Sequence, residues 1–305
     1  MKYFLIMNPG SRSGQSHSKF TKILEYFDSI QANYDYHITE KLKDAYEYSM
    51  KANLSNYDVI VAVGGDGTIN SVINGFFNDQ GNRFSNSKLA VIYTGTSPDF
   101  CKSYNIPIDL DSSLQLLKNI KTKKIDIGRI EFLSSGKEAE VKYFACCSNI
   151  GIGANIARLA NTGMRKVFGY FLGTLISLIR SVVFFKATDL NLRIDGKDIT
   201  IQKAYNISVG ITKFIASGIK VNAAKSGNFY LMVAQKINLL NLLPLLIRVY
   251  SGKSFKNTAF LNILHAENVE IHSENLNTEV EFDGDPAGHL PIKINLISKT
   301  LDLIC

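Results

Sequence analysis

One stretch of the chain, residues 58–74 (DVIVAVGGDGTINSVIN), limits the folds open to it more than any other feature. Val59–Val63 is a continuous apolar and largely β-branched run, which is typical of a parallel strand buried on both faces. Gly64–Thr68 follows, and the apolar pattern after it is that of a helix. A strand, a glycine turn and a helix start can hold phosphate on backbone N–H groups at the positive end of the helix. The stretch therefore predicts an α/β domain with a phosphate-binding loop.

Asp66 is the unexpected residue of this loop, because a carboxylate repels an anion. Its presence makes sense if a Mg²⁺ ion bridges the carboxylate and the bound anion, or if the carboxylate takes a proton during phosphoryl transfer. The loop follows neither the Walker nor the Rossmann pattern. The alternative is a tight strand–helix turn whose glycines serve only packing. We favour the first interpretation, which predicts a site for phosphoryl transfer.

Strand and helix patterns alternate along the first part of the chain, up to about residue 124. This alternation predicts a parallel sheet with helices on both faces. Ligands in such folds bind at the carboxyl ends of the strands, so the loops 8–14 and 94–100 are expected beside Gly64–Thr68. The expected strands are Tyr3–Met7, Tyr34–Thr39, Val59–Val63 and Lys88–Tyr93, and the expected helices are Ser16–Ile30, Lys41–Ala52 and Leu114–Ile120.

From Ile125 the pattern changes to alternating strands separated by Gly and Asp turns. This pattern favours a mainly antiparallel β-sandwich with inserted helices over a second parallel sheet. We therefore expect a nucleotide-binding domain over 1–124, a β-rich domain over 125–299, and a last strand, 300–305, that can return to the first domain. The expected strands are Ile125–Phe132, Val141–Cys147, Asp189–Ile194, Ile199–Val209, Phe229–Val233, Asn268–His272, Thr278–Phe282 and Ile292–Leu296, and the inserted helices are Met164–Phe185 and Leu239–Tyr250.

Charge and apolar content narrow the partners of the chain. The net charge is +7, from 34 Lys and Arg against 27 Asp and Glu, which favours a nucleotide, a nucleic acid or an anionic membrane surface without choosing among them. No block of consecutive basic residues marks a nucleic-acid arm, so we expect no nucleic-acid partner. The longest apolar stretch, Val167–Phe185, contains Arg180 and falls short of the ~20 apolar residues of a spanning helix. We expect a cytoplasmic protein, and a homodimer stays open.

A series of short motifs extends over nearly the whole chain. It runs from Asn8-Pro9 with Gly14, through Thr39-Glu40, the stretch Tyr57–Asn70, Gly95-Thr96 with Asp99-Phe100 and Asp126-Ile127-Gly128, to Asp283-Gly284-Asp285. In content and order the series resembles the bacterial diacylglycerol kinase-type lipid kinases, which are related to sphingosine kinases. NAD kinases and phosphofructokinases share the GGDGT loop but not the whole series. The resemblance implies a two-domain lipid kinase.

The resemblance also implies an activity, cofactors and site residues. The activity is transfer of the γ-phosphate of ATP to the hydroxyl of diacylglycerol or a related lipid, with Mg²⁺, at the inner face of the membrane. Asp66 and Asp99 would organise the metal, with Asp66 also catalytic, and Asp283 or Asp285 would accept the proton of the lipid hydroxyl. The residues implied for phosphate and nucleotide binding are Asn8, Ser11, Ser13, Gly14, Thr39, Gly64, Gly65, Asp66, Gly67, Thr68, Asn70, Gly95 and Thr96.

The chain departs from the family pattern at a few positions. Pro98 stands where the family has Asn, which removes an amide and a backbone N–H. Tyr93-Thr94 replaces Pro-Leu, and Ser71 replaces a common Glu. Ser226-Gly227 stands where the family has Asp-Gly of a structural Mg²⁺ site, and a hydroxyl is a poor substitute for a carboxylate toward Mg²⁺. Asp285 replaces a Glu, so that its carboxylate is kept on a shorter side chain.

Three interpretations of function stay open on the residues alone. We favour a membrane-surface lipid kinase. The second is a lipid- or nucleotide-binding relative without turnover, motivated by Pro98 and Ser226. The third is a kinase for a soluble acceptor, of the NAD kinase type. Single residues have alternatives too: Thr39 could cap the next helix, Asp283–Asp285 could be an ordinary turn, and the apolar helices could belong to a core.

Overall fold

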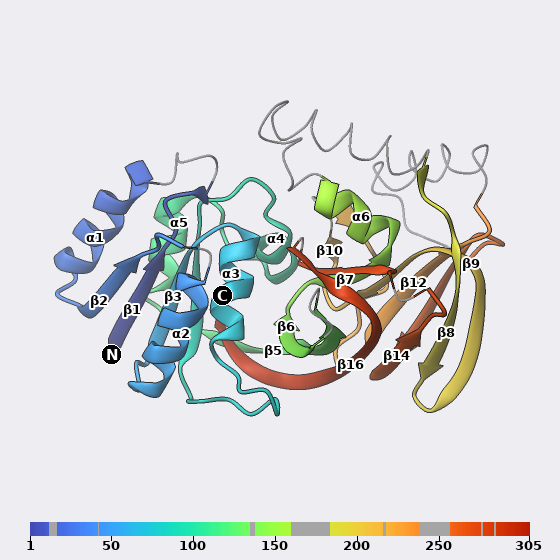
Figure 1. The fold of residues 1–305 in the computed structure, drawn as a ribbon. Coiled ribbons are helices and arrows are strands. Elements are labelled where there is room, and N and C mark those ends of the chain that lie inside the picture. Colours follow the sequence, from blue (N-terminus) through green and yellow to red (C-terminus); the bar gives the residue numbers. More distant parts are fainter. Residues whose placement is uncertain are drawn as a thin grey trace. The chain divides into compact units, whose positions relative to one another are not determined.

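A computed structural model gives the fold of the chain (Figure 1). The structure describes residues 1–11, 17–41, 43–134, 138–159, 184–215, 218–237, 257–275, 277–283 and 285–305. The chain divides into two compact units. The first unit comprises residues 1–127, 143–145 and 297–305, and the second comprises 128–142 and 146–296.

The first unit is built on parallel strands. β1 (Lys2–Met7) pairs with β2 (Asn33–Ile38) on one side and β3 (Val59–Gly64) on the other, and β3 pairs with β4 (Lys88–Tyr93). The end of β16 (Asp285–Ile304) adds a further parallel partner, with Leu303 opposite Leu89. All six residues of β3 are buried, as expected for a central strand covered on both faces.

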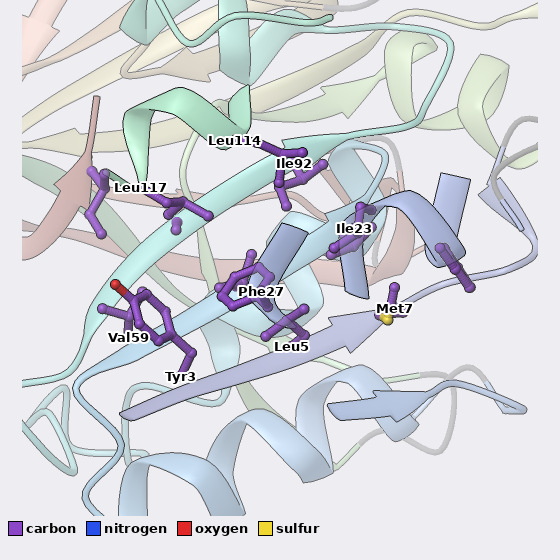
Figure 2. Packing of buried hydrophobic residues seen from close by; sticks show 14 residues of the cluster. Tyr3, Leu5, Met7, Ile23, Phe27, Val59, Ile92, Leu114 and Leu117 are labelled. Atoms are coloured by element: carbon purple, nitrogen blue, oxygen red, sulfur yellow. The ribbon is translucent and has the colours of Figure 1, made fainter. Parts of the chain in front are cut away.

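Helices pack against the sheet of this unit on both faces. On one face, α1 (Phe20–Ser29) and α5 (Leu110–Leu116) close a core in which Ile23 and Phe27 meet Leu5 and Met7 of β1 (Figure 2). On the other, Phe4 of β1 stacks on Tyr48 of α2 (Asp44–Leu54) at 6.3 Å between ring centroids. The remaining helices of the unit are a 3-10 turn at His17–Lys19, α3 (Asp66–Asn74) and α4 (Asp99–Tyr104).

The helix α3 is tightly packed against α2. Ser49 of α2 donates its hydroxyl to the Val72 carbonyl at 2.7 Å. A Cβ on Gly75, the residue after α3, would lie 2.5 Å from the Ser49 Cβ, so only glycine fits there. These contacts fix the last turn of the helix that follows the GGDGT loop against α2.

The second unit is β-rich, and the strand pairs described within it are antiparallel. Its main strand path runs β13, β12, β9, β7 and β15, and β8 joins β9 to β14. The sandwich arrangement itself stays a prediction. Three strands contribute to both units: β5 (Thr122–Leu133), β6 (Ala139–Phe144) and β16. The other elements are β7 (Cys147–Gly151), α6 (Ile152–Leu159), β8 (Thr188–Ile194), β9 (Lys197–Gly210), β10 (Phe214–Ile215), β11 (Ile219–Lys220), β12 (Phe229–Gln235), β13 (Leu261–Ala266), β14 (Asn268–His272) and β15 (Glu279–Phe282).

Several element predictions need correction. The helix expected at Leu114–Ile120 begins earlier, because Asp109 accepts the Ser112 N–H at 2.8 Å and caps α5 at its start. The strand expected over Val141–Cys147 is two strands, and the residues between them bend away from strand geometry. β13, α6 and α4 were not predicted. The apolar helices expected at 164–185 and 239–250 lie almost entirely outside the described residues.

None of the helices in the described part of the chain is long and apolar enough to cross a membrane.

Candidate nucleotide and phosphoryl-transfer site

The loops that follow the four parallel strands start at the same edge of the sheet of the first unit. Three backbone bonds fix this alignment. Asn8 N donates to Val63 O, Thr39 N donates to Met7 O and Thr94 N donates to Gly64 O, each at 2.9 Å. Because carboxyl ends of parallel strands are where open α/β sheets bind ligands, this edge is the candidate site.

The GGDGT loop has the geometry of an anion-binding turn. Gly65 precedes α3 with an extended backbone, and the first bond of the helix is donated by Ile69 N to Gly65 O at 3.0 Å. The N–H groups of the first helical turn therefore lie at the positive end of the helix dipole. A Cβ on Gly64 would lie 2.4 Å from the Thr68 side chain. Glycine is thus required for the turn itself.

The loop after β4 approaches the GGDGT loop closely. A Cβ on Gly95 would lie 2.5 Å from Gly65 Cα, and one on Gly65 would lie 3.2 Å from Gly95 Cα. Two backbones without side chains thus face each other at the sheet edge. Thr96, the next residue, is exposed, which leaves its hydroxyl accessible to a ligand.

The loop after β1 binds the GGDGT loop through side chains. Asn8 Nδ2 donates to Thr68 Oγ1 at 2.8 Å, and the Gly65 N–H donates to Ser11 Oγ at 3.2 Å. Asn8 Oδ1 in turn accepts the Gly10 N–H at 2.9 Å. Both residues were predicted to contact phosphate, and the structure places them beside the loop. Ser13 and Gly14 lie outside the described residues.

Asp66 and Asp99 are brought together at this edge. The Asp99 N–H donates to Asp66 Oδ2 at 3.1 Å. Asp99 is buried and begins α4, and Pro98 precedes it as the capping residue with φ −83°. Since proline fixes φ near this value, Pro98 suits the entry to a helix. The departure from the family pattern is therefore compatible with an ordered loop that positions Asp99.

The two carboxylates fit a hard cation such as Mg²⁺, which prefers oxygen ligands and usually keeps several waters alongside one or two carboxylates. No group of three or more His, Cys, Asp or Glu suited to a metal occurs within the residues that the structure describes.

Thr39 and Asn70 have different surroundings. The capping position of α2 is Lys43, and the N–H groups of Glu40 and Lys41 are capped by Asp44 Oδ2 at 2.7 and 2.9 Å. Thr39 thus does not cap this helix. The buried side chain of Asn70 accepts from Asn74 Nδ2 at 3.3 Å. Asn70 therefore has a structural partner in α3 in addition to its predicted contact with the nucleotide.

Asp283 lies at the end of β15 in the second unit. Its Oδ1 accepts the N–H groups of Cys146 and Cys147 at 3.0 and 2.9 Å, and its own N–H donates to Cys147 O at 2.8 Å. The residue has a left-handed backbone, with φ +49°. The carboxylate is thus fixed in one orientation by charge-assisted bonds. Gly284 lies outside the described residues, and Asp285 is described only as the first backbone position of β16.

A buried polar network near Asp283 was not predicted. Glu281 is 3% exposed and accepts from Asn149 Nδ2. Asn149 Oδ1 accepts from Asn206 Nδ2 at 3.3 Å and from the Ser208 hydroxyl. These residues come from β15, β7 and β9, so no local sequence pattern could indicate them. The network crosslinks β15, the strand that carries Asp283.

Ser226-Gly227, expected at the place of a structural metal site, forms a tight turn. Gly227 has φ +80°, and Lys225 bridges to Asn228 across the turn. The glycine is required because a side chain is strained at this φ.

Comparisons with known proteins agree with this arrangement. Residues 2–130 match the family described as the diacylglycerol kinase catalytic domain, and residues 147–305 match the YegS C-terminal NAD kinase beta sandwich-like domain. A diacylglycerol kinase of Staphylococcus aureus (strain bovine RF122) is 27% identical over 306 residues, which are 98% of this chain and 90% of the relative.

Two solved structures share the fold. A diacylglycerol kinase from Bacillus anthracis str. Sterne superposes with a TM-score of 0.72 at 20% identity, covering 99% of this chain and 96% of that one. The yeast NADH kinase complexed with NADH gives 0.60 at 12% identity, over 99% and 82%. The expected two-domain fold with a β-rich second domain is confirmed. The chain belongs to the diacylglycerol kinase-like family of lipid kinases.

Proposed function

We propose that this protein transfers the γ-phosphate of ATP to the hydroxyl of diacylglycerol or a related lipid. One observation carries the proposal. The GGDGT loop, which includes Asp66, lies beside the loop that leads to Asp99 at one edge of the sheet. An anion-binding helix start and two carboxylates would be in conflict in a site for an anion alone. They are compatible in a site that takes a nucleotide together with a divalent cation.

In the proposed reaction the residues of the first unit bind and orient the nucleotide. The N–H groups of the loop 64–68 would hold phosphate, with the exposed Thr96 hydroxyl beside them. Asp66 and Asp99 would hold Mg²⁺, which, when bound, neutralises the charge of the phosphates during transfer. Of the remaining nucleotide contacts expected from the sequence, Thr39 and Asn70 lie at or near the same edge.

The residues of the second unit would serve the lipid. Asp283 or Asp285 would accept the proton of the lipid hydroxyl as it attacks, a role of a general base. The proposed domain division is 1–124 for the nucleotide and 125–299 for the lipid. With a net charge of +7, we propose that the enzyme works in the cytoplasm as a peripheral protein at an anionic membrane surface.

A soluble acceptor is the second candidate, and one observation favours it. The fold also superposes on the yeast NADH kinase, whose acceptor is not a bilayer lipid, although the likeness at 12% identity concerns the fold alone. The matching of the first part of the chain to the diacylglycerol kinase catalytic domain favours the lipid.

The test is to incubate the protein with γ-labelled ATP and Mg²⁺, with a mixed lipid extract in one sample and NAD(H) in another. We expect labelled phosphate in a lipid that co-migrates with phosphorylated diacylglycerol. Label in the soluble dinucleotide alone would identify a soluble acceptor. ATP binding without any labelled product would identify a relative that binds without turnover.

Membrane binding is expected to depend on salt. Because a positively charged protein binds anionic headgroups through screened Coulomb attraction, its binding to anionic vesicles should weaken as ionic strength rises above ~0.15 M. Sedimentation with anionic and with neutral vesicles measures this. Equal binding to both kinds of vesicle at all salt concentrations would contradict the prediction.

A further inference from the structure

Tyr93 is a buried phenol at the candidate site, and it has no role in the proposed function. It is the last residue of β4 and lies opposite Gly64 in the parallel register. Its side chain is 5% exposed, and no described residue hydrogen-bonds the hydroxyl. Buried hydroxyl groups are nearly always paired, so an unpaired phenol here calls for an explanation.

The hydroxyl lies where the two glycine loops meet. A Cβ on Gly95 would lie 2.7 Å from Tyr93 Oη and 2.5 Å from Gly65 Cα. The phenol is therefore packed beneath the closest approach of the loops that begin at Gly64 and Thr94. The glycine at position 95 makes room for the ring as well as for the neighbouring backbone.

Two aspartates, Asp66 and Asp99, act electrostatically on the phenol. Burial raises the pKa of Tyr93, and the negative charge of Asp66 is the largest electrostatic contribution to that rise. Cys101 and Asp99 add smaller contributions, and the Ser97 N–H, which lies near the hydroxyl without the geometry of a hydrogen bond, opposes the shift. Burial and Asp66 also raise the pKa of the neighbouring Cys101 thiol. Tyr93 thus keeps its proton, and Asp66 is the principal anion beside it.

We infer that Tyr93 is a positioning residue for Asp66. The phenolic O–H donates to the Asp66 carboxylate when that carboxylate turns toward the bound nucleotide and metal. The donor is in place before the ligand arrives and makes its bond only in the loaded state. This inference rests on the proposed function, because it requires that the site takes a nucleotide with a divalent cation.

The family pattern has Pro-Leu where this chain has Tyr93-Thr94, so this donor is a feature of the present chain. It provides a polar anchor for Asp66 at a position where an apolar residue would provide none. A hydrogen bond to a charged group is stronger than one between neutral groups, so its loss should be measurable in ligand affinity.

The variant Tyr93→Phe tests the inference by two readouts with opposite expected directions. Without ligand, the melting temperature should stay the same or rise, since the substitution removes an unpaired buried hydroxyl. With the Mg²⁺ complex of a non-hydrolysable ATP analogue, calorimetry should show about tenfold weaker binding. In EDTA, where Asp66 has no metal to engage, wild type and variant should bind the analogue equally.

The matched control is Tyr230→Phe in the second unit. Its phenol is also fully buried but donates to Thr212 O at 3.0 Å. This variant should lower the melting temperature and leave the analogue's affinity unchanged. The same phenol-to-phenyl change would then give opposite results at a paired and an unpaired hydroxyl.

The coupling to Asp66 is measured with a double variant. In the Asp66→Asn background, Tyr93→Phe should cause no further loss of affinity for the Mg²⁺–analogue complex. Equal affinities of wild type and Tyr93→Phe, an additive loss in the double variant, or a lowered melting temperature of Tyr93→Phe would each overturn the inference. Wild-type protein that binds no nucleotide at all would instead overturn the proposed function.

Discussion

Asp66→Asn is expected to lower the rate of phosphoryl transfer by a factor of about 10² or more while leaving the protein folded. The substitution keeps the size of the side chain and an oxygen that can still accept the Asp99 N–H, now bonded to Asp66 Oδ2 at 3.1 Å. It removes the negative charge that would hold the cation. Because catalysis of this transfer consists mostly of positioning and charge neutralisation, the loss should appear in kcat.

The matched control is Asp58→Asn, the same substitution at the opposite end of β3. Asp58 Oδ2 accepts the Lys2 N–H at 2.7 Å and lies at the amino edge of the sheet, away from the loops of the candidate site. This variant should turn over at the wild-type rate. Circular dichroism on both variants checks that the fold is retained. An Asp66→Asn protein with wild-type turnover would contradict the assignment of this residue.

Asp283→Asn is expected to lower the rate of transfer to lipid by about 10² to 10⁴, the usual contribution of a general base. The amide oxygen can still accept the N–H groups of Cys146 and Cys147, so the orientation of the side chain should survive. Nucleotide affinity should not change, since the nucleotide is assigned to the other unit. Asp285→Asn is tested beside it, because one carboxylate would take the proton and the other orient it.

The chain offers a close structural match as a control. Asp195 also has a left-handed backbone, with φ +46°, and its Oδ1 accepts two consecutive backbone N–H groups, those of Glu267 and Asn268, at 3.1 and 2.9 Å. Asp195→Asn should therefore disturb stability as much as Asp283→Asn does, without a change in rate. If both Asp283→Asn and Asp285→Asn keep the full rate on lipid, the segment serves only as a turn.

The sequence predicted that the loops of the first unit lie at one sheet edge, because the signal for the parallel strands is local. The strand, glycine turn and helix of residues 58–74 follow one another in the chain, and the parallel order of the strands brings the other loops to the same edge. The contacts of Asn8 and Ser11 with the loop could not be predicted. Whether a polar side chain after a strand binds a ligand or the neighbouring loop depends on distances of a few ångströms.

Features that join distant parts of the chain were not predictable. Asp283 is held by the N–H groups of Cys146 and Cys147, which precede it in the sequence by 137 and 136 positions. The sequence indicates that the segment could be a turn, but it does not show the partners of Asp283. Pro98 stood out as a departure, yet its place at the start of α4 required the structure. Tyr93 stood out in the same way, and only packing revealed the surroundings of its hydroxyl.

The first unit is assembled from segments that are far apart in the chain, and this has a consequence for its synthesis. Asn74, the last residue of α3, exchanges two hydrogen bonds with the Tyr143 backbone, at 2.8 and 2.9 Å, and Leu303 extends the sheet beyond β4. A ribosome emits the first 124 residues long before it emits residues 297–305. Until then β4 is an open sheet edge, the kind of surface that pairs with other chains. The domain that carries the GGDGT loop can therefore be completed only after residues 297–305 have left the ribosome.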